Sequence, residues 1–320
     1  MHTLRLTGSA NKICIRALAI LLLVLPFPAK AQSRGVYPLG MSSTNSGITP
    51  ASGFTYSNQL LFYYRDESKD ENGVTKPVTG SNAVVMDMNS IIWVSKRTIL
   101  GGAHYSALAT LPFAKNDLTS DINGNISGGG GFADSYYVPF ILGWNEPAWS
   151  KERVSVRLLY GFLAPTGRYA SDASNNVGSG YWTHAISSGQ TFLLTRSKTW
   201  ALSTFEMYEF HTAQEGTQTH PGQTFDLDYS LVRNFTFRKS PLRFQLGVTG
   251  YEARQTTGHS GPVITPTLAA DRYAINSIGV ASQFTFPAQR LNLGMKFFEE
   301  FADRSTFQGY SLQFTGVFNF

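Results

Sequence analysis

The chain has 320 residues, of which 13% are aromatic and 15% are charged, and its formal net charge is +5. A soluble α/β enzyme of this size would normally carry charged side chains at about 25% of its positions. Beyond the N terminus, apolar residues alternate with polar ones instead of forming long runs. This pattern excludes a helical membrane protein and is typical of a membrane barrel.

Residues 1–31 are predicted to be a cleaved secretory signal. A positive n-region contains Arg5, Lys12 and Arg16, and a short apolar run and an A-x-A cleavage pattern precede Gln32. The apolar run is too short for a transmembrane anchor, which needs about 20 apolar residues. Cleavage removes four basic residues and no acid, which lowers the net charge from +5 to +1. We therefore expect no nucleic-acid partner.

The segment at 32–53 is rich in Gly, Pro and Ser and shows no periodicity. Two interpretations stay open for it. It is either a disordered periplasmic tail or a segment that folds into the lumen and plugs or narrows it, because irregular backbone is tolerated where it lines a cavity. The rest of the chain, 54–320, is predicted to form one barrel domain.

Period-2 alternation predicts about twelve strands, so the expected fold is an all-β, antiparallel, up-and-down transmembrane β-barrel. Ten or fourteen strands stay open, because the segments near 182–194 and 199–211 alternate poorly. The predicted ranges are 54–64, 83–95, 100–111, 132–144, 151–164, 182–194, 199–211, 223–237, 242–254, 272–286, 289–301 and 306–320.

Long and short connections alternate along nearly the whole chain. Short ones such as 95–98 and 238–241 contain turn formers and basic residues, whereas long ones such as 123–131 contain Gly, Asn and Ser. Outer-membrane barrels have short periplasmic turns and longer extracellular loops. A soluble β-sandwich or jelly roll is the alternative, but it gives no reason for this alternation. Only the connection at 302–305 is short where a long one is expected.

The last strand ends in an aromatic residue, as bacterial outer-membrane barrels usually do. Apolar residues occupy every second position up to Phe318 and Phe320, and the final strand must pair with the first to remove the sheet edge. We predict that both phenylalanines face lipid and present the chain to the barrel-assembly machinery. The expected location is the outer membrane, in contact with lipid and lipopolysaccharide.

Alternation also predicts which polar side chains face the lumen. Both signs of charge occur among them, which favours internal salt bridges and hydrogen bonds over a selectivity ring, and argues against a strongly ion-selective pore. The candidate lumen-lining residues are Asp87, Asn89, Arg157, Asp226, Asp228, Arg243, Gln245, Asn292, Lys296 and Glu300.

One stretch invites a catalytic interpretation. His184 and Ser188 share a strand face, but their Cα atoms would lie about 13 Å apart, too far for a base to activate a nucleophile. Ser187 would point to the opposite face. We predict no catalytic residues and no enzyme activity.

Few residues suit a metal or a cofactor, and none of either is predicted. The only cysteine, Cys14, lies in the predicted signal, so the mature chain has no thiol nucleophile or cysteine ligand. Four acidic residues in the first long loop would suit a divalent cation at the lipopolysaccharide surface or, more simply, a solvated loop. These are Asp66, Glu67, Asp70 and Glu71.

Two stretches resemble a known family of outer-membrane proteins, described as involved in the meta-pathway of phenol degradation. The first is Tyr37-Pro-Leu-Gly40 with the later Pro50-Ala-Ser-Gly-Phe54, where the family has a run of prolines, and an aromatic strand ending in Phe62-Tyr-Tyr64. The second is Ala164-Pro-Thr-Gly-Arg-Tyr169 with Asn176-Val-Gly-Ser-Gly-Tyr-Trp182. The resemblance implies a protein that passes hydrophobic or aromatic compounds, distantly like the long-chain fatty-acid transporters.

These observations predict a porin-like outer-membrane channel through which small, hydrophobic or aromatic compounds diffuse passively. A structural or surface-interaction barrel with a sealed lumen is the main alternative, and a barrel hydrolase is a lesser one.

Overall fold

The computed structural model describes residues 36–320, so the predicted signal at 1–31 lies outside the described part of the chain. Within that part, no helix has both the length and the apolar character needed to span a membrane. The one α-helix there, α2 (Pro266–Ala270), is five residues long.

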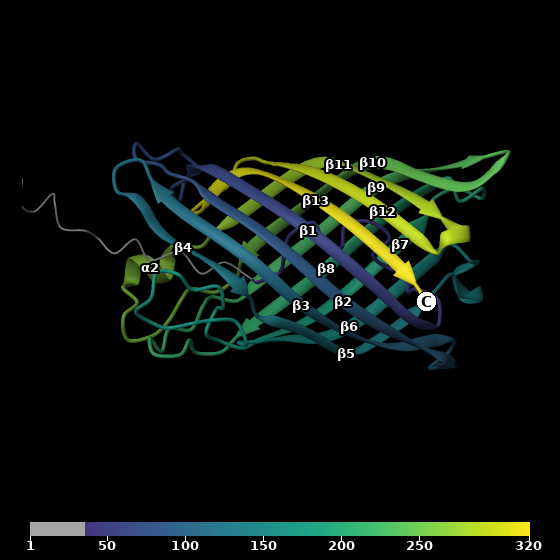
Figure 1. The fold of residues 1–320 in the computed structure, drawn as a ribbon, viewed down its shortest axis with the longest axis horizontal. Helices are drawn as coiled ribbons and strands as arrows, with labels where there is room; N and C mark the ends of the chain where they lie inside the picture. Colours follow the sequence, from purple (N-terminus) through teal and green to yellow (C-terminus); the bar gives the residue numbers. More distant parts are fainter. Residues whose placement is uncertain (1–35) are drawn as a thin grey trace, which may run out of the picture. The chain divides into compact units, whose positions relative to one another are not determined.

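Thirteen β-strands account for most of the described chain (Figure 1). Their bounds are β1 Gly53–Ser68, β2 Asn82–Ile99, β3 Ala103–Ser120, β4 Gly124–Phe132, β5 Ser135–Trp144, β6 Val154–Ala164, β7 Thr183–Leu193, β8 Trp200–His211, β9 Thr224–Phe237, β10 Ser240–Gln255, β11 Ala274–Phe286, β12 Leu291–Glu300 and β13 Phe307–Asn319.

Twelve of these strands close into an antiparallel barrel, which confirms the predicted fold. Each pairs with its neighbour in sequence order, except that β3 pairs with β5 across the β4 hairpin. The last strand returns to the first in a register that runs from Ser68↔Phe307 to Thr55↔Asn319. Beyond the last pair, the backbone N–H of Phe320 donates to the carbonyl of Phe54 at 3.0 Å. Closure satisfies the backbone groups that a sheet edge would expose to lipid.

The extra strand β4 corrects the prediction that residues 123–131 form a loop. This glycine-rich stretch pairs with the outer half of β3, from Phe113↔Phe132 to Ser120↔Gly124. A Cβ on Gly129 would lie 2.2 Å from the carbonyl oxygen of Asn175, so the glycine lets the β6–β7 loop pack closely against the hairpin.

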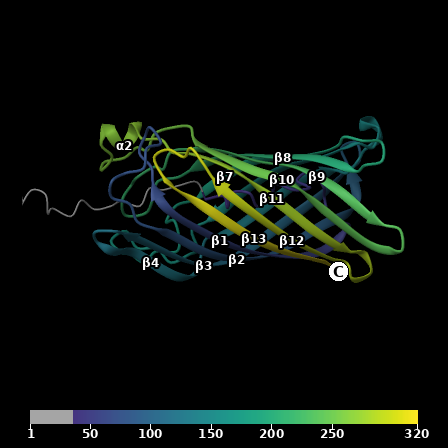
Figure 2. The ribbon, with the colours of Figure 1, turned by 90° about the horizontal axis from the view of Figure 1, so that it is seen from above.

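The ends of the barrel differ as the loop lengths predict (Figures 1 and 2). The C terminus and short turns such as 238–239 lie at one end, whereas β4, α2 and long loops such as 165–182 lie at the other. In outer-membrane barrels, the short-turn end is periplasmic and the long-loop end is extracellular.

Side chains on the inward face of the barrel wall are buried, whereas those on the outward face are exposed. On β1, Leu61 and Tyr63 point inward and are 0% and 7% exposed, whereas Phe62 and Tyr64 point outward and are 37% and 40% exposed. Phe318 and Phe320 also belong to the outward face, at 40% and 66% exposed. An outward apolar belt of this kind suits contact with lipid.

Candidate functional site in the barrel lumen

The segment 36–52, which precedes β1, runs inside the barrel and bonds to inward side chains of distant strands. Asp228 on β9 holds three of its groups: the Tyr37 hydroxyl donates to Oδ2 at 2.6 Å, the Gly40 N–H to Oδ1 at 2.8 Å, and the Ser42 N–H to Oδ2 at 2.9 Å. Because Asp228 is fully buried, these bonds replace the water that the carboxylate has lost.

Other charged lumen residues complement the backbone of this segment. Glu209 on β8 accepts from the N–H groups of Val36 and Tyr37, at 3.0 and 2.8 Å. Lys296 on β12 donates to the carbonyls of Gly40 and Met41, both at 2.9 Å. Acids therefore bind backbone donors and the cation binds backbone acceptors, so that the polar lumen fixes an irregular chain.

The segment continues toward the periplasmic end. Arg157 on β6 donates from Nε to the Ser46 carbonyl at 2.6 Å, and Asn45 donates from Nδ2 to Oε1 of Gln245 on β10 at 2.9 Å. Asn145, in a periplasmic turn, accepts from the Thr49 N–H at 2.8 Å. The segment thus occupies the lumen from its outer half to its periplasmic mouth.

Apolar packing supports this polar network. Tyr37 and Leu39, each 7% exposed, belong to the largest buried cluster, which also contains Tyr251 and Phe298. The Gly40 backbone has a φ of +82°, and a Cβ there would lie 2.6 Å from the Phe298 ring. Only glycine combines a positive φ with so close an approach, which explains the glycine at the end of the sequence Tyr37-Pro-Leu-Gly40.

A buried ion pair adjoins this cluster. Arg65 on β1 contacts Glu300 on β12 at 2.7 Å, with side chains 6% and 0% exposed. Glu300 also accepts from the Tyr251 hydroxyl and the Gly309 N–H, both at 3.0 Å. The Arg65 guanidinium stacks over the Tyr63 ring at 4.6 Å. Several hydrogen bonds therefore compensate for burying the pair.

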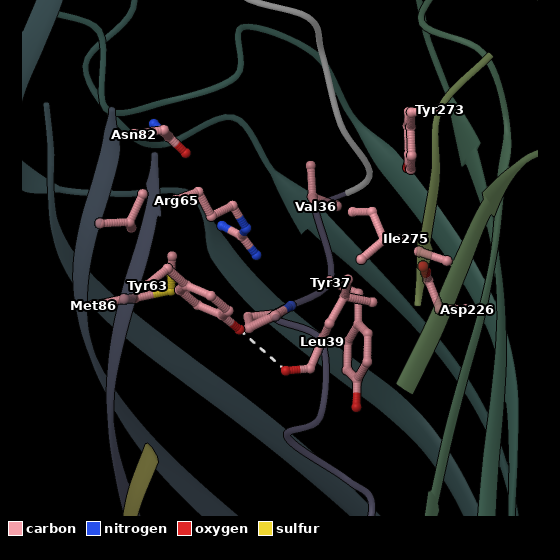
Figure 3. Close-up of a pocket in the computed structure, with 13 residues that line it drawn as sticks. Val36, Tyr37, Leu39, Tyr63, Arg65, Asn82, Met86, Asp226, Tyr273 and Ile275 are labelled. Carbon is pink, nitrogen blue, oxygen red and sulfur yellow. Dashed lines mark hydrogen bonds between the residues drawn. The ribbon is translucent and has the colours of Figure 1, made fainter. Parts of the chain in front are cut away.

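A cavity of about 170 Å³ lies on the extracellular side of the segment. In Figure 3, Tyr37 and Leu39 form one side of it, opposite Tyr63 and Met86, and the Tyr63 hydroxyl donates to the Leu39 carbonyl at 3.1 Å. The other residues that line it are Val36, Pro38, Arg65, Asn82, Val84, Asp226, Ala253, Tyr273 and Ile275. Its wall is thus mainly aromatic and aliphatic.

Asp226 is one of three polar residues in this wall, together with Arg65 and Asn82. Its side chain is 2% exposed, and within the described chain its Oδ2 has no hydrogen-bond partner. A buried acceptor without a donor is costly, and here protein atoms cover the oxygen.

The structure divides the ten candidate lumen-lining residues into eight that face inward and two that face outward. Alternation puts eight on the inward face: Arg157, Asp226, Asp228, Arg243, Gln245, Asn292, Lys296 and Glu300. Arg243 is exposed near the β9–β10 turn.

The prediction was wrong for Asp87 and Asn89. They share the outward face of β2 with Val85 and Ile91, which are 40% and 46% exposed. The inward face of β2 carries Met88, packed against Leu61 and Tyr63. The prediction failed because it placed polar residues in the lumen, whereas this part of the lumen is apolar.

Sequence reasoning missed Arg65 and Glu209. Arg65 lies one residue beyond the predicted first strand. Glu209 sits between the aromatic residues Tyr208 and Phe210 on a strand that alternates poorly, and its inward direction follows only from its register with Thr224.

The residues that invited a catalytic interpretation face outward. The Nδ1 atom of His184 lies 2.9 Å from the Tyr160 hydroxyl, and the Ser188 hydroxyl donates to Glu206 at 2.8 Å. His184 and Ser188 therefore have separate partners. Within the described chain, no group of three or more His, Cys, Asp or Glu residues is arranged to hold a metal ion.

The bonds of Asp228 predict the effect of removing it. Asp228→Ala leaves the Tyr37 hydroxyl and the Gly40 N–H without an acceptor, while the Ser42 N–H keeps only the Tyr37 hydroxyl. We therefore expect larger open-channel current fluctuations and a higher mean conductance. Single-channel recording of the reconstituted protein measures both. Glu299→Ala is the matched control, because this carboxylate is exposed on the outward face of β12. Equal current records from the two variants would contradict the prediction.

Solved structures share the fold at low sequence identity. The COG4313 outer membrane channel from Pseudomonas putida F1 aligns with a TM-score of 0.68 and 14% identity, over 85% of this chain and 97% of that one. The β domain of the Bordetella autotransporter BrkA aligns with a TM-score of 0.52 and 10% identity, over 84% of this chain and 100% of that one. Both likenesses concern the fold alone. No curated protein matches the sequence.

A family model does match. It is described as "Putative MetA-pathway of phenol degradation" and covers residues 65–316, which include all strands from β2 to β12. This agrees with the resemblance seen in the sequence motifs. The chain therefore belongs to this family of proteins.

Proposed function

We propose that this protein is an outer-membrane channel through which small hydrophobic or aromatic compounds diffuse passively. The proposal rests on the cavity at the extracellular side of the N-terminal segment. It faces the extracellular half of the lumen, and aromatic and aliphatic side chains such as Tyr63, Tyr273 and Ile275 line it. Binding sites for small molecules are typically concave and mostly apolar, with a few polar groups that fix orientation.

The size and chemistry of the cavity favour a narrow class of compound. A volume of about 170 Å³ is below the usual range of about 300–1,000 Å³ for pockets that hold drug-sized ligands. It suits a single aromatic ring with few substituents. The polar side chains of Arg65, Asn82 and Asp226 in the wall would orient a hydroxyl on that ring.

Passage beyond the cavity requires the N-terminal segment to shift. Tyr37, Leu39 and Gly40 block the path between the cavity and the periplasmic mouth. A segment held mainly by side-chain hydrogen bonds can exchange those bonds for bonds to water. A barrel sealed by this segment, with a structural or surface role, is the alternative.

Covalent chemistry has no part in the proposal. We propose that the chain acts without a cofactor, and that its other partners are lipopolysaccharide at the extracellular rim and the barrel-assembly machinery. Phe318 and Phe320 support the latter, since both face outward at the periplasmic end of the closing strand.

One experiment tests transport directly. The purified protein is reconstituted into planar bilayers and into liposomes, and single-channel conductance is compared with the uptake of labelled phenol. We expect a small conductance and an uptake rate above that of empty liposomes. Folded protein that gives neither would contradict the channel and favour the sealed barrel.

A pair of neighbouring substitutions tests the cavity. Val84→Trp places an indole in the cavity, because Val84 lines it. Val85→Trp places the same side chain on the outward face, where Val85 is 40% exposed. We expect phenol uptake to fall about tenfold in Val84→Trp and to stay unchanged in Val85→Trp. Equal uptake by both variants would show that compounds do not pass through this cavity.

A further inference from the structure

An outward arginine lies near the periplasmic end of β9. Arg233 shares the lipid-facing side of this strand with Leu231, which is 40% exposed, and it pairs in register with Trp200, the first residue of β8. Charged side chains are costly in hydrocarbon, so they are favoured on this face only where they reach the membrane interface. Tryptophan is enriched at that interface. The register with Trp200 therefore puts Arg233 at the level of the lipid headgroups.

Aromatic rings hold the Arg233 guanidinium and leave its hydrogen-bond donors free. Its Cζ atom lies 5.0 Å from the centre of the Phe235 ring and 6.0 Å from that of Trp200. Phe235 in turn packs against Phe244, with ring centroids 5.8 Å apart. Within the described chain, the Arg233 side chain has neither an acidic partner nor a hydrogen-bond acceptor. A planar guanidinium can stack on a ring and still present two parallel N–H groups to an anion.

The turns at this end of the barrel add more positive charge. With their flanks they contain ten Lys or Arg residues and two Glu residues, whereas the extracellular loops contain five Lys or Arg and eight Asp or Glu. Among the ten basic residues, only Lys198 forms an ion pair within the described chain, with Glu146. The periplasmic ranges counted are 95–102, 145–153, 194–199, 238–243 and 287–290, and the extracellular ones are 69–81, 121–123, 133–134, 165–182, 212–223, 256–273 and 301–306. Unpaired positive charge is thus concentrated at the periplasmic end.

The distribution of this charge favours a lipid over a protein as the partner. Basic residues occur in all five short turns, and these turns surround the periplasmic opening because every second connection of the barrel returns to that end (Figures 1 and 2). A soluble acidic protein would cover one side of such a ring, whereas a lipid leaflet surrounds the whole barrel. Arg233 also points outward, where lipid lies. A negatively charged phospholipid headgroup satisfies both conditions.

We propose that Arg233, Trp200 and Phe235 bind the phosphate of an anionic phospholipid in the periplasmic leaflet. The guanidinium donates to two phosphate oxygens, and the rings contact the glycerol and the first acyl carbons. The basic turns attract such lipids to the barrel, because clusters of Lys and Arg beside a membrane recognise anionic headgroups. Lipopolysaccharide also carries phosphate, but it contacts the opposite, long-loop end. The site lies outside the lumen, so its test does not depend on whether the channel conducts.

Quenching of tryptophan fluorescence by brominated lipids measures which headgroup the barrel prefers. The protein is reconstituted into phosphatidylcholine vesicles with increasing fractions of brominated phosphatidylglycerol or, in parallel, brominated phosphatidylcholine. Trp149 and Trp200, which are 65% and 37% exposed, report lipid contact at the periplasmic end. We expect phosphatidylglycerol to associate at least about fivefold more strongly than phosphatidylcholine, and added salt to weaken this preference. Equal association of the two lipids with the natural protein would overturn the proposal.

One substitution with a matched control tests the site itself. Arg233→Gln removes the charge and keeps both rings. Arg254→Gln makes the same change at another outward arginine, which lies at the extracellular end of β10 and pairs with Glu252 at 3.1 Å. We expect the preference for phosphatidylglycerol to fall about threefold in Arg233→Gln and to stay unchanged in Arg254→Gln. Heat-modifiable migration on gels verifies folding. The same preference in both folded variants would refute the site.

Two triple variants test the contribution of the turns. The periplasmic variant combines Arg196→Gln, Arg238→Gln and Lys239→Gln, and the extracellular variant combines Lys76→Gln, Arg272→Gln and Arg304→Gln. Each removes two arginines and one lysine from exposed positions. We expect only the periplasmic variant to lower the preference, by about twofold. Equal effects of the two variants would contradict the role of the turns.

Inorganic phosphate distinguishes a lipid headgroup from a free anion. Phosphate replaces chloride in the vesicle experiment at constant ionic strength, so that general screening of charge stays the same. We expect quenching by brominated phosphatidylglycerol to be unchanged. Loss of that quenching would show that the guanidinium binds free phosphate, which would overturn the lipid assignment.

Discussion

Deletion of residues 36–52 should raise the single-channel conductance of the folded barrel several-fold. Eight-stranded barrels are filled by their own side chains, whereas sixteen-stranded barrels leave an aqueous channel. Twelve strands enclose an intermediate space, and here the segment fills it through bonds to residues such as Asp228, Lys296 and Arg157. Without the segment, water enters and solvates these charges, so the barrel keeps its fold while its ion path widens. Planar-bilayer recording measures the conductance.

A replacement variant separates anchoring from simple occupancy. If residues 36–52 become a Gly/Ser segment of equal length, the chain still enters the lumen but loses Tyr37 and Leu39, which pack in the buried cluster. Its conductance should lie between those of the natural protein and the deletion, with larger fluctuations. Heat-modifiable migration on gels verifies folding. An unchanged conductance in the folded deletion variant would show that the segment does not limit the ion path.

The variant Arg65→Met should lower the free energy of unfolding by about 3–5 kcal/mol, the usual cost of removing one partner of a buried ion pair. Glu300 would keep its Tyr251 and Gly309 donors but lose the guanidinium that neutralises it at 2.7 Å. Urea unfolding in lipid vesicles, followed by tryptophan fluorescence, measures the change.

Two further variants test whether the lost charge compensation causes this effect. Arg65→Met combined with Glu300→Leu removes both charges and should recover most of the lost stability. Lys115→Met is the exposed counterpart, since Lys115 pairs with Asp117 while the two side chains are 67% and 49% exposed. It should cost less than about 1 kcal/mol, because solvent screens such pairs. Equal losses for Arg65→Met and Lys115→Met would contradict the assigned role of the buried pair.

The barrel itself could be predicted from the sequence because the lipid outside the wall and the lumen inside it require the same two-residue alternation of apolar and polar side chains. Lipid requires apolar side chains at every second position of strands such as β12, where Leu293, Met295 and Phe297 face outward at 45%, 44% and 38% exposed. The enclosed lumen accepts polar side chains at the positions between them, including Lys296. Closure through β13 follows from the need to remove sheet edges.

The rule that polar residues face the lumen failed where the lumen is apolar. On β2 it assigned Asp87 and Asn89 inward, although Met88 packs there against Leu61 and Tyr63. The path of residues 36–52 could not be predicted either, because their contacts depend on partners far along the chain and not on a local period. Tyr37 reaches Asp228 across 191 positions, a distance that no pattern within the segment encodes.

The large sequence separation of these hydrogen bonds determines the order in which they can form during folding. The N-terminal segment comes before every strand, yet its anchors arrive late: Lys296 bonds to Gly40 from 256 positions further on, and Gln313 bonds to Leu39 from 274. The segment therefore cannot acquire its final hydrogen bonds until β12 and β13 are in place. Anchors on earlier strands, such as Arg157, Glu209 and Asp228, become available first, so the segment is fixed in stages and its last bonds form only with the complete wall.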